Sequence, residues 1–104
     1  MASKKGRDLG SPIRDNIVEL LYHLKEAYGY EIYKNYLKAF GRVNLRTIYY
    51  HLNKGSSLNI FKVKKIETVE GDYSWGSGVQ RIVYSLDKNA KPKIIEEIKD
   101  KINN

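Results

Sequence analysis

The spacing of apolar residues in this chain changes from a helical repeat to a two-residue repeat close to Asn59. Before Asn59, apolar side chains recur every three or four residues, which is typical of helices with one buried face. After it, apolar and polar residues alternate over two short segments, as they do in half-buried strands. The chain has 104 residues, enough for one domain with one modest core. We therefore expect a single α+β domain, mainly α, with three helices before a β-hairpin.

Capping residues and apolar stripes define the three expected helices. The first begins at Pro12, with Ser11 as its N-cap, and ends near Tyr28. The second covers residues 30–40, and the third begins after Asn44, a good N-cap residue. The side chains expected to face the core are Ile13, Ile17, Leu20, Leu21 and Leu24 in the first helix, Ile32, Tyr33, Tyr36, Leu37 and Phe40 in the second, and Leu45, Ile48, Tyr49 and Leu52 in the third.

Glycine and asparagine residues mark the expected breaks between elements. Gly41 should stop the second helix, and the Gly-Ser-Ser run at 55–57 should shorten or kink the third. Asn59 should adopt a left-handed conformation. The alternation slips over residues 63–66, which predicts a β-bulge, and the Gly-rich run 71–78 predicts the hairpin loop. The alternating apolar residues are Phe61 and Val63 in the first strand, and Ile82, Tyr84 and Leu86 in the second.

A last helix is expected over residues 88–102, with Asp87 as its cap. Its apolar positions should form one narrow stripe, made of Ile94, Ile95, Ile98 and Ile102. Such a stripe favours pairing with a second copy of the chain over packing on its own domain. The expected organisation is thus a disordered basic arm (1–10), a main domain (11–87) and a C-terminal dimerisation helix (88–104).

The basic residues are concentrated in one part of the chain. Between Ile32 and Ile66, here called the acid-free segment, there is no Asp or Glu, although the whole chain has a net charge of +7. The segment holds eight basic residues, namely Lys34, Lys38, Arg42, Arg46, Lys54, Lys62, Lys64 and Lys65. Clustered cations gain affinity for a polyanion by displacing the counterions condensed on its phosphates. The segment therefore predicts a nucleic-acid-binding surface, with a solvated lysine-rich face as the alternative.

Composition argues against several other classes of protein. There is no cysteine, no apolar segment behind the N-terminal charges and no apolar run approaching the roughly 18 residues of a membrane span. We expect a soluble cytoplasmic protein without a membrane partner. The two histidines, His23 and His51, lack metal-ligand spacing, and no phosphate-binding loop or nucleophile motif occurs. We expect neither catalysis nor a metal or cofactor.

The order of the expected elements is that of a winged helix-turn-helix domain. In that fold the third helix enters the DNA major groove, and the hairpin loop, called the wing, reaches the flanking backbone or minor groove. The acid-free segment covers most of the second helix, the third helix and the first strand. Charge and element order therefore select the same face of the domain.

Three short motifs resemble those of PadR-like transcriptional regulators, a winged-helix family. They are Gly29-Tyr30-Glu31-Ile32, Thr47-Ile48-Tyr49-Tyr50-His51-Leu52 and Val83-Tyr84-Ser85-Leu86-Asp87. The resemblance covers about residues 12–90 and implies a cytoplasmic, nucleoid-associated homodimer that binds pseudo-palindromic duplex DNA, with the C-terminal helix in the dimer. The chain departs from the family at Gly55 and at Asn59, where the family tends to have an apolar residue and Gly. Small proteins similar to this family also occur on archaeal plasmids and viruses, some as partition adaptors that spread on DNA.

Arg46 is the leading candidate for a base contact, because its guanidinium could donate two hydrogen bonds to guanine. A phosphate contact is the equally open alternative for the same residue. Thr47 and Tyr50 are expected to touch bases or thymine methyl groups, whereas Tyr49 is expected in the core. Trp75, at the loop tip, is expected to pack or to meet a partner rather than to stack on bases. The complete expected DNA-binding set is Arg42, Asn44, Arg46, Thr47, Tyr50, Lys54, Lys62, Lys64, Trp75 and Arg81.

Lys62, Lys64 and Arg81 flank the wing and are expected to meet phosphates, with a lysine-protected strand edge as the alternative. The tyrosines of the first two helices are attributed to amphipathic packing, so no effector is expected. This group comprises Tyr22, Tyr28, Tyr30, Tyr33 and Tyr36.

The function expected from these observations is sequence-specific binding of double-stranded DNA by a homodimeric transcriptional regulator, a repressor. One alternative is a plasmid-partition or chromatin adaptor that binds and spreads on DNA. An alternative of another class is a winged-helix protein–protein docking module, whose binding would lack the strong salt dependence of phosphate contacts. Binding of single-stranded RNA is less favoured, because the strand aromatics Phe61 and Tyr84 are expected to point inward.

Overall fold

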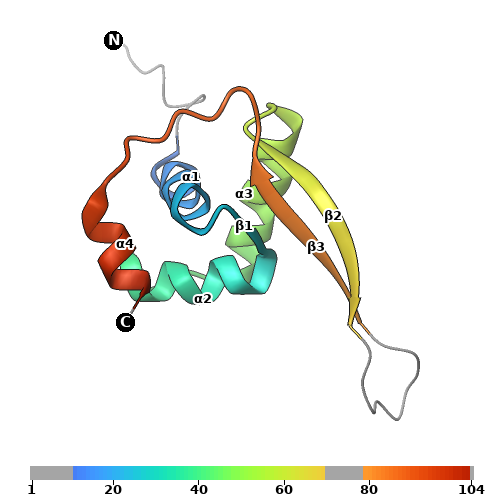
Figure 1. Cartoon of the computed structure of the whole chain (residues 1–104), viewed down its shortest axis with the longest axis horizontal. Coiled ribbons are helices and arrows are strands. Elements are labelled where there is room, and N and C mark those ends of the chain that lie inside the picture. The colour runs from blue at the N-terminus through green and yellow to red at the C-terminus, as the bar shows by residue number, and fades with distance from the viewer. Residues whose placement is uncertain (1–10, 70–78, 104) are drawn as a thin grey trace.

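The computed structural model describes residues 11–69 and 79–103 of the chain. Within them it has four helices and one three-stranded antiparallel sheet, so the expected α+β, mainly helical class is confirmed. The elements are α1 (Pro12–Leu24), β1 (Glu26–Tyr28), α2 (Gly29–Ala39), α3 (Leu45–Ser57), β2 (Phe61–Val69), β3 (Val79–Leu86) and α4 (Glu96–Ile102). The β2–β3 hairpin projects away from the helices, and α4 lies at the opposite end of the molecule (Figure 1). The expected basic arm, and the hairpin loop with Trp75, lie outside the described residues.

Helix α1 begins as expected but ends early. The Ser11 hydroxyl accepts a hydrogen bond from the Arg14 backbone N–H at 3.4 Å, which confirms the N-cap. The helix stops at Leu24 instead of near Tyr28, because Lys25 adopts a positive φ of 75°. A single residue in that region ends the helical hydrogen-bond ladder and redirects the chain.

The residues after that break form a strand that the sequence analysis missed. Ala27 in β1 pairs with Tyr84 in β3, and both side chains are buried in the core. The strand order is β1-β3-β2, so the expected two-stranded hairpin is in fact part of a three-stranded sheet. Strand β1 also leads directly into α2, whose N-terminus it therefore holds beside β3.

Helix α2 buries the face that contains Ile32 and Tyr36. Leu37 was expected to face the core but is 40% exposed, because it lies beside the buried stripe on the helical surface. Gly41 ends the helix as expected: its φ is 102°, and its N–H donates to the Tyr36 carbonyl at 3.2 Å.

Helix α3 continues through Gly55 to Ser57, so the expected early end is wrong. Gly55 is buried, and the ring of Phe61 occupies the space that a Cβ would take there. In the turn that follows, the Ile60 backbone N–H donates a hydrogen bond to the Gly55 carbonyl at 2.8 Å. Asn59 has a φ of 61°, which confirms the expected left-handed residue. The glycine thus allows the hairpin to begin in close contact with α3.

The C-terminal region differs most from its expected structure. The Asp87 carboxylate accepts the Lys88 N–H at 2.8 Å, but only a turn follows, and helix α4 is confined to Glu96–Ile102. Pro92 explains the difference, because a proline inside the expected helix would remove a hydrogen bond and clash with the preceding turn. Ile94 also has a φ of 63°, which is incompatible with a continuous right-handed helix.

Glu19 on α1 holds the segment that precedes α4. Its buried carboxylate accepts hydrogen bonds from the backbone N–H groups of Lys93, of Ile94 at 3.0 Å and of Ile95 at 3.2 Å. A carboxylate with three N–H donors is well satisfied despite its burial. This contact docks the C-terminal segment on the helical core.

The four isoleucines of the expected stripe do not share one face. Ile98 and Ile102 are buried in the core of their own domain, at 4% and 8% exposure, whereas Ile94 and Ile95 remain 48% and 39% exposed. The helix is too short to carry all four, since it begins only after Ile95. The expected dimerisation stripe is therefore split between the core and the surface.

Candidate nucleic-acid interface

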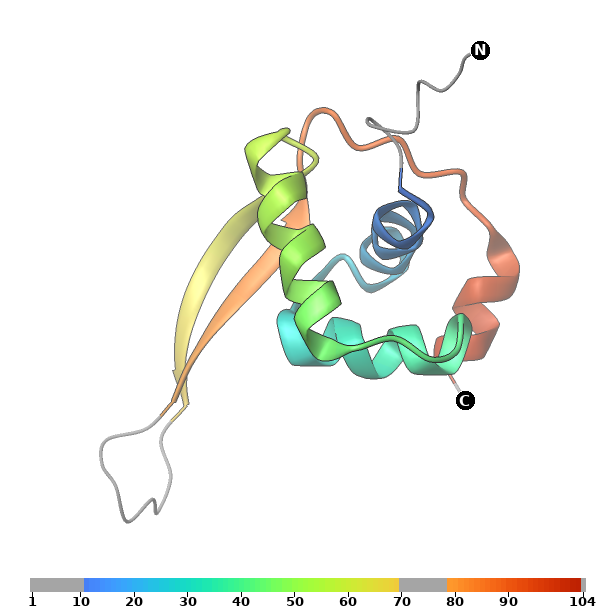
Figure 2. The same cartoon turned by 180° about the vertical axis from the view of Figure 1, so that it is seen from behind.

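Helix α3 has one buried face and one exposed basic face. Ile48 and Leu52 are fully buried, as expected. On the opposite side, Arg46, Tyr50 and Lys54 are exposed, and their spacing of four residues places them in one row along the helix. The helix contains no acidic residue. Figure 2 shows α3 in front of the other elements, with the β2–β3 hairpin projecting beside it.

The residues before the row extend the same basic surface. Arg42 and Asn44 are exposed in the connection from α2, and Thr47 in the first turn of α3 is half-buried. Asn44 occupies the N-cap position, and its backbone carbonyl accepts from the N–H groups of Thr47 at 3.0 Å and Ile48 at 3.2 Å. Its side chain makes no capping hydrogen bond, in contrast to the expectation. The Asn44 amide therefore remains on the surface, next to Arg46.

Tyr50 contacts His51, and His51 in turn contacts Arg14. The Tyr50 ring meets the His51 ring edge-on, with 5.0 Å between centroids. Arg14, almost fully buried in α1, lies with Nη1 3.3 Å from His51 Nδ1. Since a guanidinium can only donate, Nδ1 accepts this hydrogen bond. Burial, and secondarily the Arg14 charge, lower the pKa of His51 and favour its neutral form.

The β2 lysines lie on a different face from the α3 row. Tyr84 points into the helical core, so its neighbour Ser85 and the cross-strand partner Lys62 lie on the other side of the sheet. There Lys62 and Lys64 border a surface hollow together with Tyr22 at the end of α1. The structure does not bring these two lysines onto the surface formed by Arg46, Tyr50 and Lys54.

Ion pairs offset part of the charge on that side of the sheet. Lys64 and Lys65 lie 3.3 and 3.4 Å from the Glu26 carboxylate, and Lys65 also lies 3.2 Å from Glu67. Lys64, with Lys65, lowers the pKa of the Glu26 carboxyl. Exposed pairs of this kind contribute little to stability, but they reduce the local positive potential. Strand β1, which supplies Glu26, was absent from the sequence-based expectation.

The side of the hairpin that faces α3 carries apolar residues instead. Val63, Ile66 and Ile82 are 50%, 59% and 43% exposed, and Ile66 pairs directly with Ile82. The expected bulge is confirmed as a register shift between Val63 and Lys65. The extra residue keeps Val63 and Ile66 on one face although they are three positions apart. These residues, Val63, Ile66 and Ile82, are called the apolar hairpin strip below.

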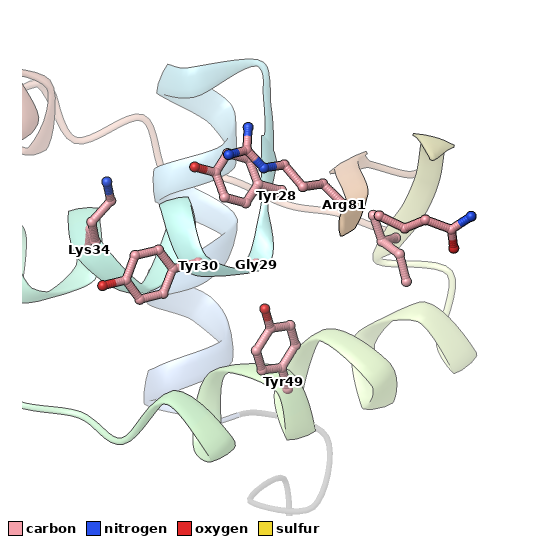
Figure 3. Close-up of a pocket in the computed structure, with 8 residues that line it drawn as sticks. Tyr28, Gly29, Tyr30, Lys34, Tyr49 and Arg81 are labelled. Atoms are coloured by element: carbon pink, nitrogen blue, oxygen red, sulfur yellow. The ribbon is translucent and has the colours of Figure 1, made fainter. Parts of the chain in front are cut away.

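A cavity of about 450 Å³ opens between the start of α2, the middle of α3 and the start of β3. Tyr49 was expected in the core but is 39% exposed, and its ring packs against Gly29, where a Cβ would collide with it. Arg81 flanks the wing in β3, as expected, and its guanidinium lies over the Tyr28 ring, with 4.3 Å from Cζ to the centroid (Figure 3). The polar and aromatic side chains lining the cavity are Tyr28, Tyr30, Lys34, Tyr49, Gln80 and Arg81.

Sequence reasoning missed this cavity, although it identified parts of it. Tyr30 belongs to one of the recognised motifs and Lys34 to the acid-free segment. The tyrosines were attributed to amphipathic packing; Tyr36 is buried, whereas Tyr28 and Tyr30 also line the cavity. No local signal indicates that β3 lies beside the start of α2, because that contact depends on β1.

The described residues show neither a metal centre nor a membrane span. No group of three or more His, Cys, Asp or Glu side chains lies together in residues 11–69 and 79–103. No helix in these ranges is long and apolar enough to cross a membrane. The chain matches no model of a known protein family and has no significant similarity to a curated protein.

Proposed function

We propose that this protein binds double-stranded DNA sequence-specifically, as a winged helix-turn-helix domain with α3 in the major groove and the β2–β3 hairpin as the wing. The observation that carries the proposal is the exposed row of Arg46, Tyr50 and Lys54 on a helix without acidic residues. The major groove, about 12 Å wide, admits one α-helix. The order of three helices followed by a hairpin supports the same arrangement.

The row offers three kinds of contact to a duplex. Arg46, near the N-terminus of α3, is suited to donate two hydrogen bonds to a guanine edge. Tyr50 is held by His51 and offers a ring and a hydroxyl to the next base pairs. Lys54 lies one turn further on, where an ammonium group can meet a phosphate. Direct readout at Arg46 and Tyr50 would make the binding sequence-specific.

We further propose that the protein acts as a homodimeric regulator, a PadR-like repressor located with the DNA in the cytoplasm. Ile98 and Ile102 belong to the core, so the exposed Ile94 and Ile95 are the remaining apolar residues of that region for an interface. Two-fold symmetry would present two α3 helices to half-sites about 34 Å apart. Sedimentation velocity of the intact chain tests the dimer directly.

The apolar hairpin strip favours a second candidate, a protein–protein docking module. Three exposed apolar side chains on one hairpin face suit a protein partner better than a phosphate backbone. Such a module would bind its partner without the steep salt dependence that follows from counterion release. The two candidates thus differ in a quantity that one titration series measures.

Selection of bound duplexes from a random library at about 0.15 M salt tests the proposal. The expected result is an inverted repeat, recovered with half-sites close to one helical turn apart. Arg46→Ala should then lose about 1–3 kcal/mol of binding free energy and relax the preference at one base pair. Lys99→Ala, which removes an exposed charge on α4, is the matched control and should retain the preference.

Other outcomes would contradict parts of the proposal. Retention without a shared sequence would replace the regulator with a spreading partition or chromatin adaptor. An equal loss for Arg46→Ala on every sequence would make Arg46 a phosphate contact. No retention would remove the DNA-binding function and leave the docking module.

A further inference from the structure

We propose that the cavity between α2, α3 and β3 binds one nucleoside phosphate, with the base among the tyrosine rings and the phosphate at Arg81 and Lys34. The proposal does not rest on the proposed function, because none of the row residues Arg46, Tyr50 and Lys54 lines the cavity. Its volume of about 450 Å³ lies within the range of small-molecule sites, which is roughly 300–1,000 Å³. It is lined by residues from four separate elements, β1, α2, α3 and β3 (Figure 3).

Aromatic rings supply the surface for a base. Tyr30 and Tyr49 come from different helices and both line the cavity, and each is more than a third exposed. The Tyr49 ring is fixed against Gly29, which has no Cβ to displace it. Proteins that bind single strands of nucleic acid stack successive bases on such rings. The rings therefore provide a site for a flat aromatic group.

Cationic groups lie at the same opening. The Arg81 guanidinium stacks over the Tyr28 ring at 4.3 Å, and Lys34 Nζ lies 5.4 Å from the centroid of the Tyr30 ring. Within the described residues neither cation forms an ion pair, since the three ion pairs there all involve Lys64 or Lys65. Stacking leaves the edge of the guanidinium free for a bidentate contact with a phosphate.

Two further features favour a nucleotide over a simple anion or an apolar molecule. The first turn of α2 begins at the cavity with Gly29, and its backbone amide groups favour an anion there, an effect that Glu31 in the same turn partly offsets. Gln80 adds an amide that can both donate to and accept from a base edge. A phosphate ion alone would leave the rings unused, and an apolar molecule would leave both cations unpaired.

Titration calorimetry of the intact chain with adenosine 5′-monophosphate and guanosine 5′-monophosphate tests this assignment. At least one mononucleotide should bind at least about tenfold more tightly than adenosine or inorganic phosphate, since each of these offers only half of the contacts. Arg81→Ala should weaken mononucleotide binding by about tenfold or more. Lys38→Ala is the matched control: Lys38 is an exposed lysine one turn beyond Lys34 on α2 and does not line the cavity.

Three results would overturn the proposal: no mononucleotide binds, inorganic phosphate binds as tightly as the mononucleotides, or Arg81→Ala binds them like the parent chain.

A competition experiment then identifies the source of the nucleotide. Displacement of the mononucleotide by a duplex with a 5′-phosphorylated single-stranded overhang, and not by a blunt duplex, assigns the cavity to a strand end. Retention of the mononucleotide against both duplexes assigns the cavity to a free nucleotide. Neither arm depends on Arg46, so failure here is distinguishable from failure of duplex recognition by α3.

Discussion

The contact between Gly55 and Phe61 leads to a prediction in which two general rules oppose each other. Gly55 lies inside α3, where alanine is normally the better residue. A Cβ at this position would collide with Cδ2 and Cε2 of the Phe61 ring, which is only 1% exposed. We expect Gly55→Ala to destabilise the protein.

The expected loss in the free energy of unfolding is the difference between two opposing contributions. Replacing glycine with alanine inside a helix stabilises by about 1 kcal/mol. Overpacking a filled core costs about 1–3 kcal/mol, and an enclosed ring that must move at two carbon atoms belongs at the upper end of that range. The net loss is therefore about 2 kcal/mol in the free energy of unfolding. For a domain of this size, that corresponds to a decrease in Tm of about 8–16 °C.

Urea and thermal denaturation, followed by circular dichroism, measure this change. Asn53→Ala is the matched control, because it changes helix propensity at an exposed position of the same helix. It should raise the free energy of unfolding by about 0.5 kcal/mol. Adding Phe61→Leu to Gly55→Ala should restore space for the new methyl group, with a favourable coupling of at least about 1 kcal/mol between the two changes.

A Gly55→Ala variant that is more stable than the parent would refute the reasoning. Helix propensity would then dominate, and the Phe61 ring could not lie against this glycine. Strictly additive effects of Gly55→Ala and Phe61→Leu would lead to the same conclusion, because residues in contact are expected to couple.

Two other predictions concern Glu19 and His51. Glu19→Gln should lower the free energy of unfolding by about 2–3 kcal/mol in urea titrations, because a neutral amide accepts more weakly and turns an NH₂ group toward the backbone N–H donors. Asp15→Asn, at an exposed position of the same helix, is the control and should change the free energy of unfolding little. Equal losses for the two variants would contradict the role of Glu19. For His51, the folded-state pKa lies below the usual histidine value of about 6.5 because burial disfavours the charged ring, so the folded state binds fewer protons than the unfolded state. Stability therefore falls as pH drops below about 6.5 toward the folded-state pKa. Urea midpoints at pH about 7.5 and about 5.5 should therefore differ more for the parent than for His51→Gln, and an equal difference would exclude His51 as the cause.

Local chemistry made much of the helical region predictable. Ser11 caps α1, Gly41 ends α2 and Asn59 takes the left-handed conformation, each because of its own backbone and side-chain properties. The bulge near Val63 was visible as a slip in the alternation. Strand β1 was not predictable in this way, because three residues carry no period of their own and become a strand only by pairing with β3.

The candidate interface was predictable to the same extent. The row of Arg46, Tyr50 and Lys54 follows from helical spacing once the buried residues of α3 are recognised. The position of Lys64 could not be predicted from spacing, because its ion-pair partner Glu26 comes from β1. The face of the sheet on which Lys64 lies also depends on the bulge. The stripe expected around Ile98 failed for a similar reason, since Glu19 and Pro92 determine where the last helix begins.

By itself, then, the sequence determined the greater part of α1, α2 and α3, the two strands of the hairpin, and where the positive charge is concentrated. These properties depend on backbone geometry and side-chain chemistry within single segments. Only the tertiary structure decided that Arg81 stacks on Tyr28, that Tyr49 lies against Gly29 and that a cavity forms between them. The physical reason is that such contacts join segments far apart in the chain, and their existence depends on how strand β1 pairs across the core.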